Sequence, residues 1–259
     1  MSVPEVVIHA DPVVLAAAVA ARLVTKVVDA QSARGWASVV LTGGGTGTAV
    51  LEHLNASPAR DAIDWQRIDL YWGDERFLPS GDPERNETQA RAALLDHIRV
   101  APERVHAIEP SDGSFGDDPD AAADAYAELL ASAARPEDHF AVPTFDVCLL
   151  GVGEEGHVAS VFPESPAVYE TTRTVVAVRN CPKPPPTRVS LTLPAIRRST
   201  EVWLLTTGAA KSAAVAMALG EAGEVQVPAA GARGQRRTLW LLDRAAATKV
   251  PDRFAPPIA

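Results

Sequence analysis

Short apolar runs alternate with helix-forming segments along the whole chain, and this alternation most narrows the folds available to it. The runs are short enough for buried strands, whereas the segments between them, such as 13–33 and 121–134, are rich in alanine and favour helix. The pattern predicts an α/β fold: a three-layer, mainly parallel, Rossmann-like sheet with helices on both faces. The expected strands are residues 6–8, 37–41, 68–72, 145–150, 175–178, 189–193, 202–206 and 239–242.

No repeat or low-complexity tract divides the sequence. We therefore expect one domain over residues 1–259, with a loose, proline-rich tail from about residue 251. Asp11 and Pro12 predict the start of the first long helix, because an N-cap residue precedes a proline at the first helical position. Gly35 predicts its end.

The segment 145–163, FDVCLLGVGEEGHVASVFP, holds the most distinctive candidate site. Glycines break its apolar run, and His157 follows Gly156 at once. A strand that ends in a glycine-rich turn can deliver a histidine to the carboxyl edge of a sheet, where a near-neutral side chain suits proton transfer. The alternative, that His157 only caps the turn, stays open at this point.

A second glycine-rich turn, TGGGTGT at residues 42–48, separates an expected strand from an apolar helix at 49–54. Free N–H groups at a helix N-terminus bind anions, so this turn is a candidate anion site. It lacks the lysine of a P-loop, and its glycine spacing differs from that of dinucleotide-binding motifs. A tight turn without a ligand is the alternative.

Charged residues follow the expected strand at 68–72, where such groups usually face a cleft. Arg76 could bind a phosphate group through two N–H groups, and Asp74 could orient a histidine or accept a proton. A surface cluster of ion pairs that includes Glu75 is the alternative.

Prolines stiffen the segment 180–188, NCPKPPPTR. A rigid loop would present Lys183 and Arg188 to an anion with little further loss of conformational entropy. A proline-rich surface linker is the alternative.

The net charge of -9 argues against nucleic acid or an anionic membrane as partner. Candidate segments that follow parallel strands converge on one crevice. The residues alone therefore predict acid–base chemistry on a phosphorylated small molecule. Two isolated cysteines and the lack of a signal peptide or membrane span indicate a cytoplasmic protein, with a single Cys148–Cys181 disulfide left open.

Four motifs, LTGGGTG, WGDERFLP, LLGVGEEGHVASVFP and PKPPPTRVSLTLPAI, resemble the successive motifs of 6-phosphogluconolactonases. The resemblance covers nearly the whole chain and implies the fold shared by glucosamine-6-phosphate deaminases and ribose-5-phosphate isomerases. The chain departs from the family at four positions. Gly45, Gly47, Glu155 and Val158 stand where the family usually has Ser, Pro, Asp and Thr.

The resemblance implies a catalytic domain that hydrolyses 6-phospho-D-glucono-1,5-lactone to 6-phosphogluconate, in the oxidative pentose phosphate pathway, without metal or organic cofactor. In the mechanism we predict, neutral His157 takes a proton from the attacking water and Asp74 orients His157. Backbone N–H groups, with Arg76, stabilise the oxyanion. The predicted catalytic residues are His157 and Asp74. The predicted substrate-binding residues are Gly43, Gly44, Gly45, Thr46, Arg76, Gly156, Lys183 and Arg188.

Two alternatives stay open beside this function. An amino-sugar-phosphate deaminase or aldose–ketose isomerase of the same superfamily would share the Gly-His pair but lack a match to residues 183–192. A non-enzymatic sugar-phosphate sensor would keep the cations but need no base. We also expect a monomer, an exposed Lys211, and an Asn86 that supports its loop.

Overall fold

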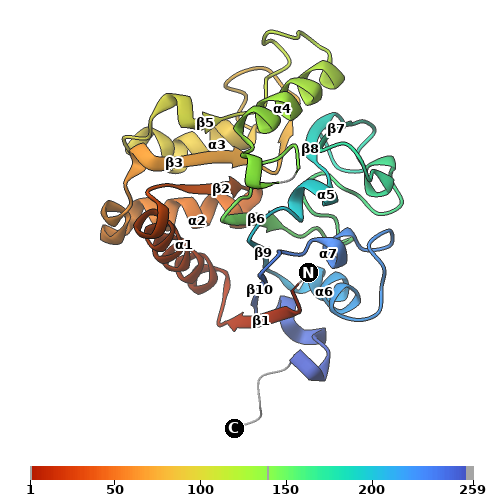
Figure 1. The fold of residues 1–259 in the computed structure, drawn as a ribbon. Helices are drawn as coiled ribbons and strands as arrows, with labels where there is room; N and C mark the ends of the chain where they lie inside the picture. Colours follow the sequence, from red (N-terminus) through yellow and green to blue (C-terminus); the bar gives the residue numbers. More distant parts are fainter. Residues whose placement is uncertain (1, 139, 255–259) are drawn as a thin grey trace.

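A parallel β-sheet forms the centre of the molecule (Figure 1). The computed structural model describes residues 2–138 and 140–254, and within these ranges seven strands make up this sheet. Every neighbouring pair in it is parallel, which confirms the predicted α/β fold. The order is β1 (Pro4–His9), β10 (Arg237–Asp243), β9 (Glu201–Thr206), β6 (Val147–Gly151), β2 (Ala37–Leu41), β3 (Ile68–Trp72) and β5 (Val105–His106).

Helices cover both faces of the sheet. Because parallel crossovers are right-handed, connections that run in opposite directions along the sheet place their helices on opposite faces. The connections through α1 (Pro12–Arg34), α2 (Gly44–Ala56) and α3 (Asn86–Ala93) lead towards β5. Those through α4 (Pro119–Ala133), α5 (Leu193–Ile196) and α6 (Ser212–Leu219) lead back towards β1. On the first face α1 packs along α2, and on the second α7 (Pro228–Gly231) packs against α6.

The first helix begins and ends where the sequence predicts. The Asp11 side chain accepts a hydrogen bond from the N–H of Val14 at 2.8 Å, and Pro12 occupies the first turn. Gly35 ends the helix in the left-handed region, with φ of 84°. A stripe of buried residues four positions apart, which includes Leu15, Val19, Leu23 and Val27, anchors the helix to the core.

A second, antiparallel sheet corrects part of the prediction. In the described ranges it contains three strands, β4 (Asp74–Arg76), β8 (Arg188–Leu191) and β7 (Val175–Val178). We expected residues 175–178 and 189–193 to be strands of the main sheet. The connection 179–187 is too short for a parallel crossover, so β7 and β8 pair as antiparallel neighbours instead. Lys183 therefore lies in the connection between two strands of the small sheet.

The centre of the main sheet positions the candidate site. β2 and β6 are adjacent, yet the chain leaves β2 towards β5 and leaves β6 towards β1. In an open parallel sheet such a reversal opens a crevice outside the carboxyl ends of the two strands. The turn at residues 42–46 follows β2, and the turn at residues 151–157 follows β6.

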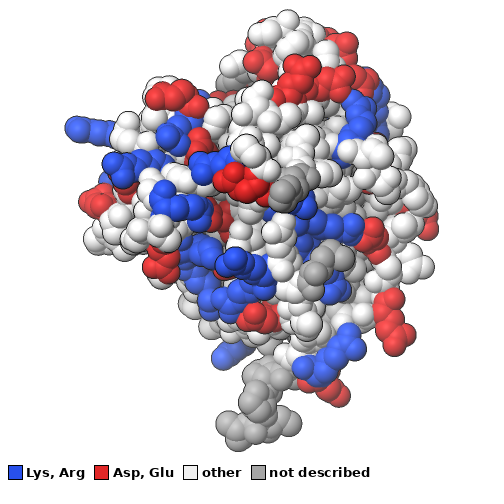
Figure 2. All heavy atoms as spheres, viewed as in Figure 1, with Lys and Arg blue, Asp and Glu red and all other residues white. Residues whose placement is uncertain are grey.

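The cysteines, the helices, the C-terminal residues and the surface charge bear on further predictions made from the sequence. Both cysteines are free thiols, so the disulfide that the sequence left open does not form here. Across the described ranges, no helix combines the length and apolar character needed to span a bilayer. Asp252–Phe254 form a short 3-10 helix, and residues 255–259 of the predicted tail lie outside the described residues. On the face shown in Figure 2, Lys and Arg side chains gather across the middle, so the negative net charge is not spread evenly.

Candidate active site

One cavity brings together the segments that the sequence singled out. It is lined by the turn at residues 42–46, by residues 151–154, and by side chains of both sheets. His157, Arg76 and Lys183 share it, as the predicted site requires. The predicted site residues in its lining are Gly43, Gly44, Gly45, Thr46, Asp74, Arg76, His157, Lys183 and Arg188.

Gly156 is the predicted site residue that lies behind this lining. Its N–H donates to the carbonyl of Gly153 at 3.0 Å, which leaves it no proton to offer a substrate. Its φ is 87°, and a Cβ at this position would meet the Cγ1 atom of Val227 at 2.5 Å. Glycine is therefore required here for the turn that delivers His157 to the cavity.

His157 presents one side of its imidazole to the cavity. Its Nδ1 is buried and lies 3.2 Å from Oε1 of Glu155, an ion-pair distance rather than an aligned hydrogen bond within the described residues. Nε2 is therefore the nitrogen left for a ligand. The ring also packs on Phe162, with ring centroids 4.4 Å apart. Burial lowers the pKa of His157, although the Glu155 carboxylate opposes this shift, so the imidazole is neutral near pH 7 and can accept a proton.

Glu155 joins the histidine to the proline-rich loop. Its Oε2 accepts a hydrogen bond from Nζ of Lys183 at 2.9 Å. Burial raises the pKa of Glu155, but hydrogen bonds from its own backbone and from Lys183 outweigh burial and leave the pKa below its ordinary value. An ionised Glu155 therefore lies between the imidazole of His157 and the ammonium of Lys183.

Asp74 contacts groups other than the imidazole. Its Oδ2 accepts a hydrogen bond from Oγ of Ser160 at 2.6 Å, and Nη1 of Arg188 lies 3.9 Å from the same oxygen. Nδ2 of Asn86 donates to the Asp74 carbonyl at 2.8 Å. No hydrogen bond joins Asp74 to His157 among the described residues, so the predicted orienting role stays a prediction. Asp74 and Glu75 are both buried, which excludes a surface cluster of ion pairs.

The N-terminus of α2 opens into the cavity. The helix begins at Gly44, earlier than the expected residue 49, so the glycine-rich turn is itself the first turn of the helix. The N-cap residue is Gly43, which has no side chain, so no N-cap side chain accepts a hydrogen bond from the first N–H groups within the described residues. Free N–H groups and the positive end of the helix dipole therefore face the cavity, which suits an anion.

The two predicted arginines are partly engaged by the protein. Nη1 of Arg76 donates to the carbonyl of Glu84. Nε and Nη2 of Arg188 donate to the carbonyls of residues 183–185 at 3.1–3.2 Å. Arg188 thus holds the loop that carries Lys183. Its Nη1 lies 3.9 Å from Oδ2 of Asp74, forms no hydrogen bond within the described ranges, and can still donate to a ligand.

Lys211 also lines the cavity, although we expected it to be exposed. It ends the short 3-10 helix Ala209–Lys211, just after β9. Burial lowers its pKa, and the neighbouring Lys183 ammonium lowers it further. The signal was in the sequence, because Lys211 follows an expected parallel strand at the same sheet edge as the other candidates.

No group of three or more His, Cys, Asp or Glu side chains in residues 2–138 and 140–254 is arranged to hold a metal ion. The absence of a cofactor stays a prediction.

Comparison with known proteins identifies the family of this chain. Residues 10–240 match the family model described as glucosamine-6-phosphate isomerases/6-phosphogluconolactonase. The chain belongs to this family. A 6-phosphogluconolactonase of Streptomyces coelicolor is 63% identical over 254 residues, which cover 98% of this chain and 97% of that protein.

Solved structures agree with this assignment. The 6-phosphogluconolactonase of Trypanosoma brucei has a TM-score of 0.82 at 29% identity, covering 96% of this chain and 99% of that one. A monomeric glucosamine-6-phosphate deaminase has a TM-score of 0.76 at 22% identity, covering 95% and 99%, and shows the shared fold alone. The predicted family and fold type are confirmed.

Proposed function

We propose that this protein hydrolyses 6-phospho-D-glucono-1,5-lactone to 6-phosphogluconate, the second step of the oxidative pentose phosphate pathway. One observation carries the proposal: the neutral imidazole of His157 shares a cavity with an uncapped helix N-terminus and with four cationic side chains. The relative from Streptomyces coelicolor, which is named for this activity, supports it. The four cations are Arg76, Lys183, Arg188 and Lys211.

The phosphate group of the substrate binds at the first turn of α2. Backbone N–H groups of residues 43–46 donate to its oxygens, and the helix dipole favours its charge. Arg76 and Lys211 add charge-assisted hydrogen bonds, and Nη1 of Arg188, which lies 3.9 Å from the Asp74 carboxylate, contributes a further donor. This local cluster overcomes the repulsion that a net charge of -9 exerts on an anionic substrate.

His157 acts as the general base on water. Nε2 takes a proton as the water oxygen bonds to the lactone carbonyl carbon, and the carbonyl oxygen becomes an oxyanion. When the bond between this carbon and the ring oxygen breaks, the imidazolium returns the proton to the ring oxygen. The product acid then ionises. A positioned base supplies about 10²–10⁴-fold in rate, which is a sufficient contribution for a lactone that already hydrolyses in water.

Glu155 and the backbone complete this mechanism. Glu155 holds the Nδ1 side of His157, so the opposite nitrogen faces the substrate. Backbone N–H groups of the glycine turns stabilise the oxyanion, and one such donor is typically worth about 2.7–4 kcal/mol. Asp74, fixed by Ser160 and Asn86, contributes negative charge that favours the imidazolium formed in the reaction.

An assay of wild-type protein separates this function from the alternatives. Acid release from freshly generated phosphogluconolactone near neutral pH should rise well above the spontaneous rate. Glucosamine 6-phosphate should yield no ammonia. Ammonia release without faster lactone hydrolysis would instead identify a deaminase, and ligand binding without turnover of either compound would identify a sensor. The monomeric state and the cytoplasmic location stay predictions.

A further inference from the structure

A buried carboxylate lies directly behind the cavity wall. Glu75, in the middle of β4, is 1% exposed, and its Oε1 accepts hydrogen bonds from the N–H groups of Arg76 at 2.8 Å and Asn86 at 2.6 Å. Its Oε2 accepts a third hydrogen bond from the N–H of Glu87 at 2.8 Å. Three backbone donors therefore converge on one side chain that itself does not line the cavity in the described structure.

These donors come from both ends of one loop. Arg76 ends β4, whereas Asn86 and Glu87 begin α3. The N-cap position of α3 is Arg85, which provides no side-chain cap in the described structure. The Glu75 carboxylate takes over this task from a neighbouring strand, since a negative charge at a helix N-terminus satisfies free N–H groups and the dipole.

Arg85 fixes the same loop from its other side. It is fully buried, and its Nη2 lies 3.7 Å from Oε2 of Glu75. The guanidinium also donates to the carbonyl of Leu78 at 3.2 Å and to that of Ile108 at 2.7 Å. Burial raises the pKa of Glu75 to about 7, although Arg85 and the backbone donors oppose this shift. Burying a carboxylate costs free energy, and the hydrogen bonds from the three backbone N–H groups, together with the ion pair with Arg85, offset this cost for Glu75.

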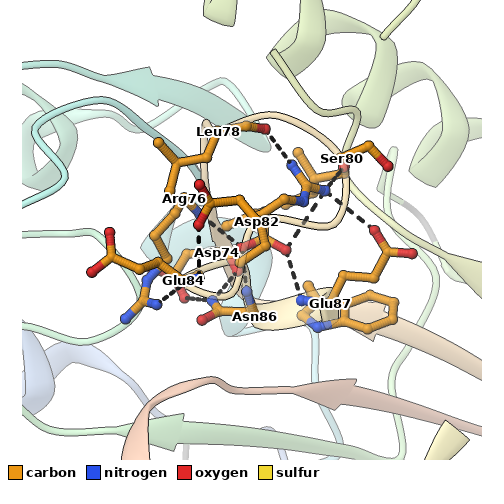
Figure 3. Close-up of polar contacts among 12 residues, drawn as sticks. Asp74, Arg76, Leu78, Ser80, Asp82, Glu84, Asn86 and Glu87 are labelled. Carbon is orange, nitrogen blue, oxygen red and sulfur yellow. Dashed lines mark hydrogen bonds and ion pairs between the residues drawn. The ribbon is translucent and has the colours of Figure 1, made fainter. Parts of the chain in front are cut away.

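The two ends of this loop carry cavity-lining side chains. Arg76 and Asn86 both line the cavity, and Asn86 also donates to the carbonyl of Asp74 (Figure 3). Asn86 is 2% exposed and packs so closely on Gly43 that a Cβ there would lie 1.8 Å from Oδ1 of Asn86. A shift of the loop would therefore move the Arg76 guanidinium and the contact with the phosphate-binding turn together.

We propose that Glu75 is a positioning residue of the active site, whose carboxylate joins β4 to the first turn of α3 and so holds Arg76 and Asn86 against the cavity. This inference rests on the proposed function. Glu75 does not touch the substrate and acts on its binding through these two neighbours. In the proposed complex Arg76 holds the phosphate group equally in the ground state and the transition state, so loss of the Glu75 carboxylate weakens binding in both states. Its loss should therefore raise KM more than it lowers kcat.

The test compares Glu75→Gln with Glu87→Gln. Both changes remove a carboxylate that pairs with Arg85, but only Glu75 accepts the loop N–H groups. We expect Glu75→Gln to raise KM for the lactone about tenfold and to raise the Kd of 6-phosphogluconate, measured by calorimetry, about tenfold. This magnitude corresponds to the loss of one charge-assisted contact with the phosphate group. Its kcat should fall less than about threefold, and Glu87→Gln should keep KM within about twofold of wild type. A structural defect alone would reduce the folded fraction without changing KM.

A double variant tests whether Arg76 carries the effect. In an Arg76→Ala background, adding Glu75→Gln should raise KM by no more than about twofold further. A folded Glu75→Gln protein with wild-type KM and product affinity would overturn the proposal, and so would a full tenfold effect without Arg76. If Glu75→Gln does not fold, Glu75→Asp, which is too short to reach all three N–H groups, is judged by the same criteria. Product binding is measured without turnover, so an inactive wild-type protein would contradict the proposed function but leave this test in place.

Discussion

Nδ1 of His157 lies 3.2 Å from one carboxylate oxygen of Glu155, whose other oxygen binds the ammonium of Lys183 at 2.9 Å. The general base of the proposed reaction is thus adjacent to a carboxylate that is itself paired with a cation. Burial and the Lys183 charge lower the pKa of His157, whereas Glu155 raises it. The Glu155 carboxylate therefore limits how far burial lowers the pKa of His157.

Glu155→Gln should move the acidic limb of the pH profile to lower pH. Removing the carboxylate removes an interaction that raises the pKa of His157, so the imidazole stays neutral to more acidic pH. The measurement is kcat/KM for the lactone between about pH 5 and 8, where histidine titrates, with the spontaneous rate subtracted. Glu154→Gln removes a neighbouring charge from the same turn and should leave the limb in place. A limb that moves to higher pH in Glu155→Gln would contradict the assignment.

Lys211→Ala should weaken binding of the phosphorylated substrate. Loss of one charged donor to phosphate should raise KM by about tenfold or more, because hydrogen bonds to charged groups contribute about 1.5–3 kcal/mol. Kinetics with glucono-1,5-lactone, which lacks the phosphate group, should be unchanged by the substitution. Lys249→Ala, outside the cavity lining, is the control. Equal losses with both lactones would remove Lys211 from the phosphate site.

Gly43→Ala should damage both affinity and stability. The new Cβ would meet Oδ1 and Cγ of Asn86 at 1.8 and 2.3 Å, so either Asn86 or the first turn of α2 must move. Strain of this kind typically costs about 1–3 kcal/mol. Gly223→Ala is the control, since a Cβ there meets nothing within 4 Å. Thermal melting and KM for the lactone together check the expectation, and a variant with unchanged Tm and KM would contradict the observed packing.

Most of the main sheet and the limits of α1 could be predicted because local signals determine them, but β5, which is only two residues long, was not among the expected strands. Apolar runs define the strands, and Asp11, Pro12 and Gly35 mark the limits of α1. The small sheet could not be predicted, because alternation along the sequence does not reveal which strand pairs with β7 or β8. That pairing depends on the chain reversal after β3, where the N–H of Leu191 donates to the carbonyl of Gly73 at 2.8 Å.

The candidate site was predictable in its parts but not in its contacts. Motifs identified His157, Arg76 and Lys183, yet which carboxylate lies beside the imidazole depends on side-chain directions within a tight turn. Lys211 was missed because a lysine near a helix start is usually exposed, and only the packing after β9 partly buries it. Spacing in the sequence gives no sign that the Glu75 carboxylate caps a helix eleven positions away.

The most direct test of the proposed mechanism is hydrolysis of fresh phosphogluconolactone by His157→Ala, followed as acid release near pH 7. Removing the general base should lower kcat by about 10²–10⁴-fold while 6-phosphogluconate still binds, and His53→Gln on α2 should retain wild-type kinetics. A folded His157→Ala protein with near wild-type kcat would show that another group takes the proton from water.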